Sequence, residues 1–457
     1  MTRSIGFLAS ELQGKYPRGV TRVARAYAER LAQTDEFDLV CLLRRVPQQS
    51  AITYRGCDLK DWLRAHPLRC DPDDVPLPRK LFKGVLRWTL PPALAEALYP
   101  TYAFLRNGLA ALRTRNRRAL APADYVTLKE LDALVVFDPC SQIYDLPLEN
   151  EPAYVAGWFH DAIPLRIHEG HQANPDQFSA AVSRLTSQAG LIVCDSASAE
   201  ADLHTFFPRS AGKTVVIHHG HDQARFRAGA PAEKRREVLA KYLSDVVTPY
   251  FIAVGDIEPR KNTVALLRAC RYLRETSDRR FQLVLVGRPG GFGRRGADVI
   301  EGLCRSAGAV RTDYVEDADL PALTSGALAL LYPSLWEGFG IPPLEALSAG
   351  TLVVASDLAS LPEVLESAAI YCDPYDVRSI AAAMQECLEM SPEERQRRIA
   401  LGIQHAQRFT WEASVAKLTA HLRAHFRDPA RPPAIFPNRP HCPLMAGPLG
   451  SEVPEAS

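Results

Sequence analysis

Two stretches of this 457-residue chain repeat one order of features: an apolar run, a glycine-bearing loop and an amphipathic pattern. In the first stretch, Ser4 to Ala9 is apolar, and a loop with Gly14 and Gly19 follows. From Val20 to Leu31, apolar side chains then recur every three or four residues, which indicates a helix. Strand, loop and helix in this order open a doubly wound α/β domain, whose parallel sheet is covered by helices on both faces.

The second stretch begins at residue 250. Tyr250 to Val254 is predicted as a strand, Gly255 to Asn262 as a loop and Thr263 to Leu273 as a helix. The charged segment from Ala232 to Leu243 lies between the two units and places their boundary near residues 235–248. Two such units form a cleft between the carboxyl ends of their sheets, where α/β sheets bind ligands.

Composition excludes several classes of protein. The 54 Lys+Arg and 53 Asp+Glu residues leave a net charge of +1, which argues against a general polyanion binder. The ten cysteines include no C-x-x-C pair, so neither a zinc site nor a thioredoxin-like motif is supported. No apolar run approaches the ~20 residues that span a bilayer, and the apolar stretch at the amino terminus is too short for a signal peptide. We therefore expect a cytoplasmic protein.

The most informative string runs from Ser334 to Gly350, SLWEGFGIPPLEALSAG. Its glycines allow close backbone approach to a ligand, and Pro342 and Pro343 suit the first turn of a helix. The free N–H groups of that turn favour an anion or a sugar hydroxyl. Glu337 and Glu345 can hold two separate sets of hydroxyl groups. By spacing alone, two solvated glutamates at a helix start would be the simpler interpretation.

The whole string decides otherwise, because it resembles the E-G-F-G-x-P-x-L-E-A signature of the nucleotide-sugar glycosyltransferases of family 4. Further segments resemble that family in order and spacing, strongly over residues 250–412 and more loosely before them. They are VGDIEPRKN (254–262), LVLVG (283–287), YPS (332–334), LPEV (361–364), CDP (372–374), FTWE (409–412), GVTR (19–22) and His160-Asp161. The family often has a proline where Leu352 stands, and no motif is recognised between Asp58 and Leu131.

The resemblance implies the GT-B fold: two Rossmann-like doubly wound domains facing across a cleft, with a C-terminal helix that crosses back to the first. The expected division is an acceptor-side domain (1–240), a nucleotide-sugar donor domain (241–408) and a crossing helix (409–428). The proline-rich residues 429–457 are expected to be a disordered tail.

The resemblance also assigns roles. Arg260 and Lys261 would neutralise the leaving diphosphate, since two adjacent cations suit that charge. Glu337 would face the donor sugar, and His160 would lie near the transferred sugar, with Asp161 as its candidate orienting partner. The catalytic candidates are thus His160, Glu337, Arg260 and Lys261, and the donor-binding candidates are Gly19, Asp161, Phe339, Gly340, Ile341, Leu344 and Glu345. Among these, Gly19 would approach the distal phosphate and Glu345 the ribose hydroxyls.

The implied activity is retaining transfer of a hexose to a glycan or polyprenyl-linked glycan in surface-polysaccharide synthesis. The IEPRKN string favours mannosyltransferase-like members, hence GDP-mannose as the donor. No D-x-D motif stands at a strand end, so a metal-independent enzyme without a cofactor is expected. A nucleotide-sugar epimerase of the same shape and a non-catalytic glycan-binding relative remain as alternatives.

Residues 79–118 interleave arginines and lysines with aromatic and aliphatic side chains. That mixture suits an anionic lipid surface, although amphipathic helices with a solvated basic face would show it equally. It gives the hypothesis of peripheral association with the inner face of the plasma membrane.

Overall fold

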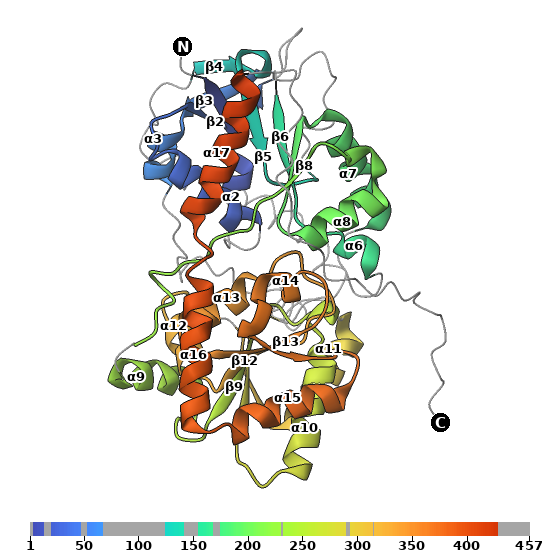
Figure 1. Ribbon diagram of the computed structural model, residues 1–457, viewed down its shortest axis with the longest axis vertical. Coiled ribbons are helices and arrows are strands. Elements are labelled where there is room, and N and C mark those ends of the chain that lie inside the picture. The colour runs from blue at the N-terminus through green and yellow to red at the C-terminus, as the bar shows by residue number, and fades with distance from the viewer. Residues whose placement is uncertain are drawn as a thin grey trace, which may run out of the picture.

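The computed structural model forms two lobes, each built around one sheet (Figure 1). Gly19, the segment 79–118 and the tail 429–457 lie outside the residues that it describes. Those residues are 3–12, 20–46, 53–66, 124–140, 154–167, 174–229, 232–288, 293–313 and 315–427.

The first domain contains an eight-stranded sheet in the order β4-β3-β2-β1-β5-β6-β7-β8. Its strands are β1 (Ser4–Leu8), β2 (Asp38–Val46), β3 (Thr53–Asp58), β4 (Asp124–Thr127), β5 (Ala133–Val136), β6 (Val155–Phe159), β7 (Leu191–Cys194) and β8 (Thr214–Val216). The sheet is parallel, as predicted, except at one edge, where β3 pairs antiparallel with both β2 and β4. The sequence of β3, TYRGCD, lacks the continuous apolar run that marks a buried parallel strand.

Helices cover both faces of this sheet. They are α1 (Ala9–Leu12), α2 (Val20–Leu31), α3 (Leu59–Ala65), α6 (Ile163–Arg166), α7 (Pro175–Gln188) and α8 (Ala197–Phe206), with short 3-10 helices η2 (Leu128–Glu130) and η5 (Pro208–Ser210). One core, around Phe7, Tyr27 and Trp158, lies under α2. The other, around Phe159 and Leu185, lies under α7.

The second domain contains a fully parallel six-stranded sheet in the order β11-β10-β9-β12-β13-β14. Its strands are β9 (Tyr250–Val254), β10 (Gln282–Val286), β11 (Ala309–Asp313), β12 (Ala329–Tyr332), β13 (Leu352–Ser356) and β14 (Ile370–Cys372). In sequence order this is 3-2-1-4-5-6, the doubly wound arrangement in which the strand order reverses beside the first strand. The crevice at that reversal, between β9 and β12, is the place where such sheets bind ligands.

The helices of the second domain also lie on both faces of the sheet, over two separate apolar cores. They are α9 (Ala232–Tyr242), α10 (Thr263–Thr276), α11 (Gly293–Ala307), α12 (Leu320–Ser325), α13 (Ile341–Ser348), α14 (Leu361–Leu365), α15 (Val377–Glu389) and α16 (Pro392–Ala406), with η6 (Pro259–Lys261) and η7 (Glu366–Ala368). α9 spans the boundary predicted between residues 240 and 241, and its Val238 and Leu239 pack in the second domain's core.

The chain returns to the first domain through α17 (Trp411–Arg427), shown in red in Figure 1. Trp411, Val415 and Leu418 of this helix are buried in the first domain's core. The rings of Trp411 and Tyr27 of α2 meet edge to face, with centroids 5.8 Å apart. The predicted crossing helix is therefore present, and it ties the end of the second domain to the first.

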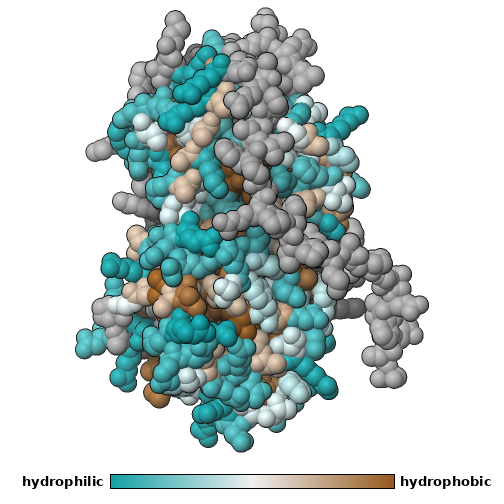
Figure 2. Space-filling view, in the orientation of Figure 1, coloured by the Kyte–Doolittle hydropathy of each residue, from teal (hydrophilic) through white to brown (hydrophobic). Residues whose placement is uncertain are grey.

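The face seen in Figure 2 is mainly hydrophilic, and its largest apolar area lies on the second domain. Large exposed hydrophobic side chains are few among the described residues, and they are scattered: Val247, Tyr272, Val299, Tyr375 and Leu401. Within the described part of the chain, no helix has the length and apolar character needed to cross a membrane.

Candidate functional site

A loop after the central strand β9 positions two cations at the carboxyl edge of the second sheet. Gly255 turns the chain out of β9 with a φ of +139°, a conformation that favours glycine. The short η6 follows, and Asn262, in the left-handed conformation with a φ of 57°, starts α10. Arg260 and Lys261 therefore lie between two fixed backbone turns.

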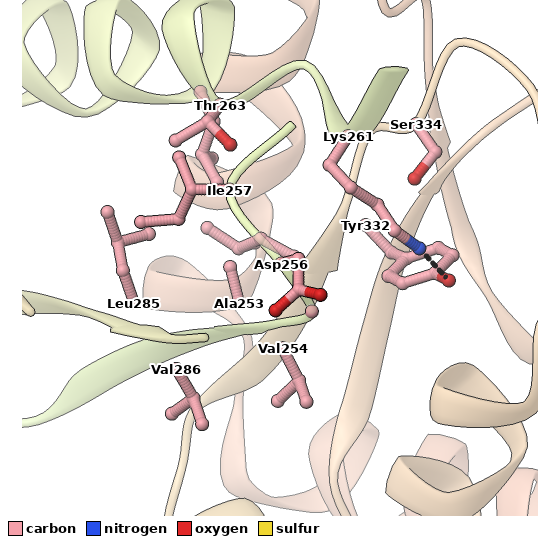
Figure 3. A pocket seen from close by; sticks show the side chains of 13 residues that line it. Ala253, Val254, Asp256, Ile257, Lys261, Thr263, Leu285, Val286, Tyr332 and Ser334 are labelled. Carbon is pink, nitrogen blue, oxygen red and sulfur yellow. Dashed lines mark hydrogen bonds between the residues drawn. The ribbon is translucent and has the colours of Figure 1, made fainter. Parts of the chain in front are cut away.

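These cations converge on Glu337, which belongs to the loop after the neighbouring strand β12. Arg260 donates to one carboxylate oxygen of Glu337 at 2.9 Å, and Lys261 donates to the other at 2.6 Å. Lys261 also donates to the Tyr332 hydroxyl at 2.6 Å, the bond drawn in Figure 3. Arg260 also donates to Glu258 at 3.1 Å, so two carboxylates face the two cations at this buried point of the cleft.

In the triad formed by Glu337, Arg260 and Lys261, burial and neighbouring charges shift the pKa values in opposite directions. Burial alone would raise the pKa of Glu337, but Arg260 and Lys261 outweigh it and lower the pKa to about 2. Burial lowers the pKa of Lys261 to about 8, and the attraction of Glu337 offsets this only in part. Glu337 is thus ionised at neutral pH, whereas Lys261 titrates close to it.

Beside the triad, a pocket opens where β9, β10 and β12 end (Figure 3). Apolar side chains form its floor, and Asp256, Lys261, Tyr332 and Ser334 supply polar groups. The pocket has room for little more than a water molecule, so it marks the strand ends beside Lys261 and is not a complete ligand site.

Side-chain hydroxyls of the second domain hold the loop that carries Glu337. Ser360 donates to the carbonyls of Glu337 and Phe339 at 2.9 and 3.0 Å, and Ser356 donates to the carbonyl of Ser334 at 2.6 Å. Gly340, with a φ of 107°, is the residue before α13, and prolines stand in the first turn of that helix as predicted. The loop therefore delivers Glu337 in a fixed position.

Glu345 lies on α13 with only 4% of its surface exposed. One of its carboxylate oxygens accepts a hydrogen bond from Arg22 of the first domain. Burial raises the pKa of Glu345, and Arg22 works against that rise. The residue predicted to bind ribose hydroxyls is thus held across the cleft by an arginine from the GVTR motif.

Other contacts also join strand-end loops of the two domains. Ser196, after β7, donates to the carbonyl of Gly338 at 2.7 Å, and Glu363 accepts from the backbone of Ala197 and Ser198. A Cβ added to Gly338 would lie 2.2 Å from the His160 carbonyl oxygen, so the loop passes directly over that residue. The carboxyl edges of both sheets therefore face each other, as predicted.

The hypothesis that Asp161 orients His160 is wrong. His160 Nδ1 lies 2.7 Å from a carboxylate oxygen of Asp195, which follows β7. The Asp161 carboxylate instead accepts from the backbone N–H of Ile163 at 2.9 Å. Adjacent residues at a strand end point in different directions, so the partner came from the neighbouring strand.

The remaining predicted donor-binding residues are divided between cleft and core. Phe339 is buried against the rings of His218 and His219, and Leu344 lies wholly in the second domain's core. Ile341 is half-buried and packs against the cores of both domains. The Leu344 side chain consequently packs α13 against the second domain's core.

Sequence reasoning did not assign Asp195, Trp336 or Glu363 to the site. Trp336 donates to Asp202 at 3.1 Å and lies 4.9 Å from the guanidinium of Arg166, both residues of the first domain. The signal for Asp195 was present, since a charged residue directly follows the buried run Leu191 to Cys194. Nothing local could have paired Trp336 or Glu363 with the other domain.

A family model described as glycosyl transferases group 1 matches residues 234–405. Residues 234–405 are a group 1 glycosyl transferase domain. This confirms the predicted kinship with glycosyltransferases, while the finer assignment to family 4 stays a prediction.

Curated relatives of the group 1 domain include mannosyltransferases. The chain is 38% identical over 163 residues to an O-antigen chain mannosyltransferase B of Escherichia coli, which covers 36% of this chain and 42% of that protein. It is 28% identical over 288 residues to a serotype-specific mannosyltransferase WbdA of Escherichia coli, covering 62% of this chain and 34% of that protein. The chain thus spans less than half the length of these two relatives.

Solved structures extend the likeness over both domains. A sucrose-phosphate synthase from Thermosynechococcus elongatus superposes with a TM-score of 0.62 at 19% identity, covering 93% of this chain and 99% of that one. HepE from Anabaena, in complex with UDP and glucose, superposes with a TM-score of 0.61 at 15% identity, covering 92% of this chain and 100% of that one. The fold is the GT-B fold of glycosyltransferases, as predicted.

Proposed function

We propose that the chain is a retaining glycosyltransferase that moves a hexose from a nucleoside-diphosphate sugar to a glycan or polyprenyl-linked glycan in surface-polysaccharide synthesis. The observation that carries the proposal is the convergence of Arg260 and Lys261 on Glu337 in the cleft of a group 1 domain. Both cations can turn from Glu337 to the diphosphate of a bound donor. They would leave Glu337 free to face the sugar.

In the proposed transfer, the bond between the anomeric carbon and the distal phosphate oxygen breaks. The acceptor hydroxyl oxygen forms its bond to that carbon on the same face, and its proton passes to the leaving phosphate. Negative charge grows on the diphosphate as the bond breaks, and fixed cations stabilise such charge. Arg260 and Lys261 are the groups on this chain that would do so, and we propose that no metal is needed.

GDP-mannose is the proposed donor. It is favoured because the relatives named above are mannosyltransferases and because residues 257–262, IEPRKN, resemble mannosyltransferase-like members. The acceptor would enter from the first domain. A lipid-linked acceptor would also require the membrane association proposed for residues 79–118.

A panel of nucleotide sugars tests the function. Purified protein should release the nucleoside diphosphate slowly from one donor, GDP-mannose, by hydrolysis. Glu345→Ala and Arg260→Ala should abolish the release. Tight donor binding without release, with or without candidate acceptors, would favour the non-catalytic relative. No binding at all would contradict the donor site, and loss of turnover on chelation, restored by magnesium, would contradict metal independence.

The pKa of Lys261 gives a second prediction. Because that pKa is lowered to about 8, Lys261 loses its charge as the pH rises through 8. Affinity for GDP should therefore fall between about pH 7.5 and 9.5, a range above the terminal phosphate pKa of about 6. At about pH 8.5, binding should also take up protons, since a bound diphosphate favours charged Lys261.

Calorimetric titrations in two buffers of different ionisation enthalpy measure that proton uptake. Lys261→Met should bind more weakly and show no uptake. If the wild-type affinity is flat across that pH range, Lys261 does not contact the diphosphate.

A further inference from the structure

The carboxyl edge of the first sheet carries a row of polar groups across five adjacent strands. The row follows the strand order β1-β5-β6-β7-β8 and consists of Glu11, the Phe137–Asp138 backbone, His160, Asp195 and His219. Glu11 accepts hydrogen bonds from the backbone N–H groups of Phe137 and Asp138 at 3.0 and 3.1 Å. The Phe137 carbonyl then lies 2.7 Å from His160 Nε2. His160 is thus held between the ends of β5 and β7.

Both ring nitrogens of His160 face groups that only accept hydrogen bonds. Nε2 faces the Phe137 carbonyl, and Nδ1 faces the Asp195 carboxylate at 2.7 Å. A neutral imidazole carries one N–H and one lone pair, so it would set a lone pair against one of these oxygens. The contacts are satisfied together only when both nitrogens carry hydrogen. The geometry therefore describes an imidazolium.

A metal ion, in place of a proton, could also hold this cluster together, because His160, Asp195 and His219 each offer a ligand atom. These atoms lie within 4.8 Å of one another. Metal ligands would point at a common centre about 2.0–2.2 Å from each. Here both imidazoles approach one carboxylate oxygen of Asp195, at 2.7 Å from His160 and 2.9 Å from His219. The 2.7 Å contact from His160 Nδ1 is a hydrogen bond, which places a proton between these two atoms, whereas His219 Nε2 lies near the same oxygen without a hydrogen bond.

We propose that Asp195 is a positioning residue that keeps His160 doubly protonated, so that His160 acts as a fixed cation in the cleft wall and not as a general base. The proposal rests on the glycosyl transfer proposed above. It assigns proton removal from the acceptor to another group, which agrees with transfer of that proton to the leaving phosphate.

The backbone of His160 lies close to the proposed transfer site. Its carbonyl oxygen lies under Gly338, the neighbour of Glu337, and Glu337 binds Arg260 and Lys261. The Asp161 carboxylate interacts electrostatically with both His160 and Arg260, so the imidazole belongs to the same cleft. An imidazolium there would add a positive group from the first domain to Arg260 and Lys261 of the second.

The ionisable groups that face His160 are Asp195, Asp161, Glu11 and His219. Burial disfavours the charged ring, but Asp195 and the Phe137 carbonyl outweigh it and raise the pKa of His160 to about 9. Burial likewise disfavours ionised Asp195, yet His160 and His219 lower its pKa to about 2. The pair stays charged between these values.

The test combines nitrogen NMR of the ring with kinetics of Asp195→Asn. In full-length protein labelled with ¹⁵N-histidine, His160 should show both ring nitrogens protonated at about pH 7.5, with a midpoint above about pH 8. His160→Gln identifies the resonances. In Asp195→Asn the midpoint should fall below about 6.5, the ordinary histidine value. The kcat for donor turnover should fall about 10- to 100-fold, by analogy with the outer-shell partners of metal-binding histidines. The KM for the donor should stay close to that of wild type.

Asp132→Asn is the matched control. Asp132 accepts from the backbone and side chain of Ser4 at the opposite edge of the same sheet, so its loss should lower stability without moving kcat or the His160 midpoint. A neutral His160 in wild type near neutral pH, or a kcat and midpoint unchanged in Asp195→Asn, would overturn the proposal. Should wild type turn over no donor, the proposed function fails, while the NMR midpoint still decides whether Asp195 holds the charge.

Discussion

Replacing Arg260 with glutamine is expected to lower kcat for donor turnover by about 10²–10³, the usual loss when one preorganised charge-stabilising group is removed. Arg260 donates through its guanidinium to Glu337 and Glu258, while its backbone carbonyl accepts from the N–H of Leu335. Because glutamine keeps the backbone bond and loses the charge, the expected loss comes from weaker stabilisation of the leaving diphosphate. Arg260→Lys should recover part of the rate, since it restores the charge without the planar fork.

Arg271→Gln is the matched control for Arg260→Gln. Arg271 is an exposed arginine of the same domain, and it pairs with Glu275 one helical turn away. Its loss should change kcat less than twofold. Steady-state release of the nucleoside diphosphate measures both variants, and an Arg260→Gln rate within twofold of wild type would show that Arg260 does not stabilise the transition state.

Gly287→Ala is expected to destabilise the second domain by about 3 kcal/mol or more. Gly287 follows β10 with a φ of +150°, and an added Cβ would lie 1.8 Å from the Gly255 carbonyl oxygen. That oxygen belongs to backbone at the start of the loop that carries Arg260 and Lys261, so it can move only if the loop moves. Donor binding should weaken together with stability.

Thermal unfolding measures the effect of Gly287→Ala, with an expected fall in Tm of about 6–12 °C for a domain of this size. Gly302→Ala is the control, because Gly302 lies in α11 and an added Cβ there meets nothing within 4 Å. Alanine is the better helix former, so that variant should be neutral or more stable by up to ~1 kcal/mol. Equal Tm values for Gly287→Ala and wild type would contradict the tight backbone contact.

The second domain could be predicted well from the sequence, because β9, β10, β12 and β13 are largely buried and show as apolar runs. Strand β11, AVRTD, and strand β14, of three residues, have no such run, so the sequence does not mark them as strands. The edge strands β3 and β4 are unmarked for the same reason.

For the candidate site, the family resemblance predicted that Arg260, Lys261 and Glu337 lie in one cleft. In the structure, Arg260 and Lys261 both donate hydrogen bonds to Glu337. The partner of His160 could not be predicted in this way. Asp161 is adjacent in the chain, but Asp195 lies on the neighbouring strand, 35 residues away. Likewise, 323 residues separate Arg22 from Glu345. Such pairs depend on strand order and on how the domains meet.

The most direct test of the donor site is the release of GDP from GDP-mannose by wild-type protein, measured beside Glu345→Ala. Glu345 is the buried carboxylate proposed to bind the ribose hydroxyls. We predict slow release by wild type and none above background by Glu345→Ala. Equal release by both proteins, or wild-type protein that neither binds nor cleaves any nucleotide sugar, would contradict the proposed site.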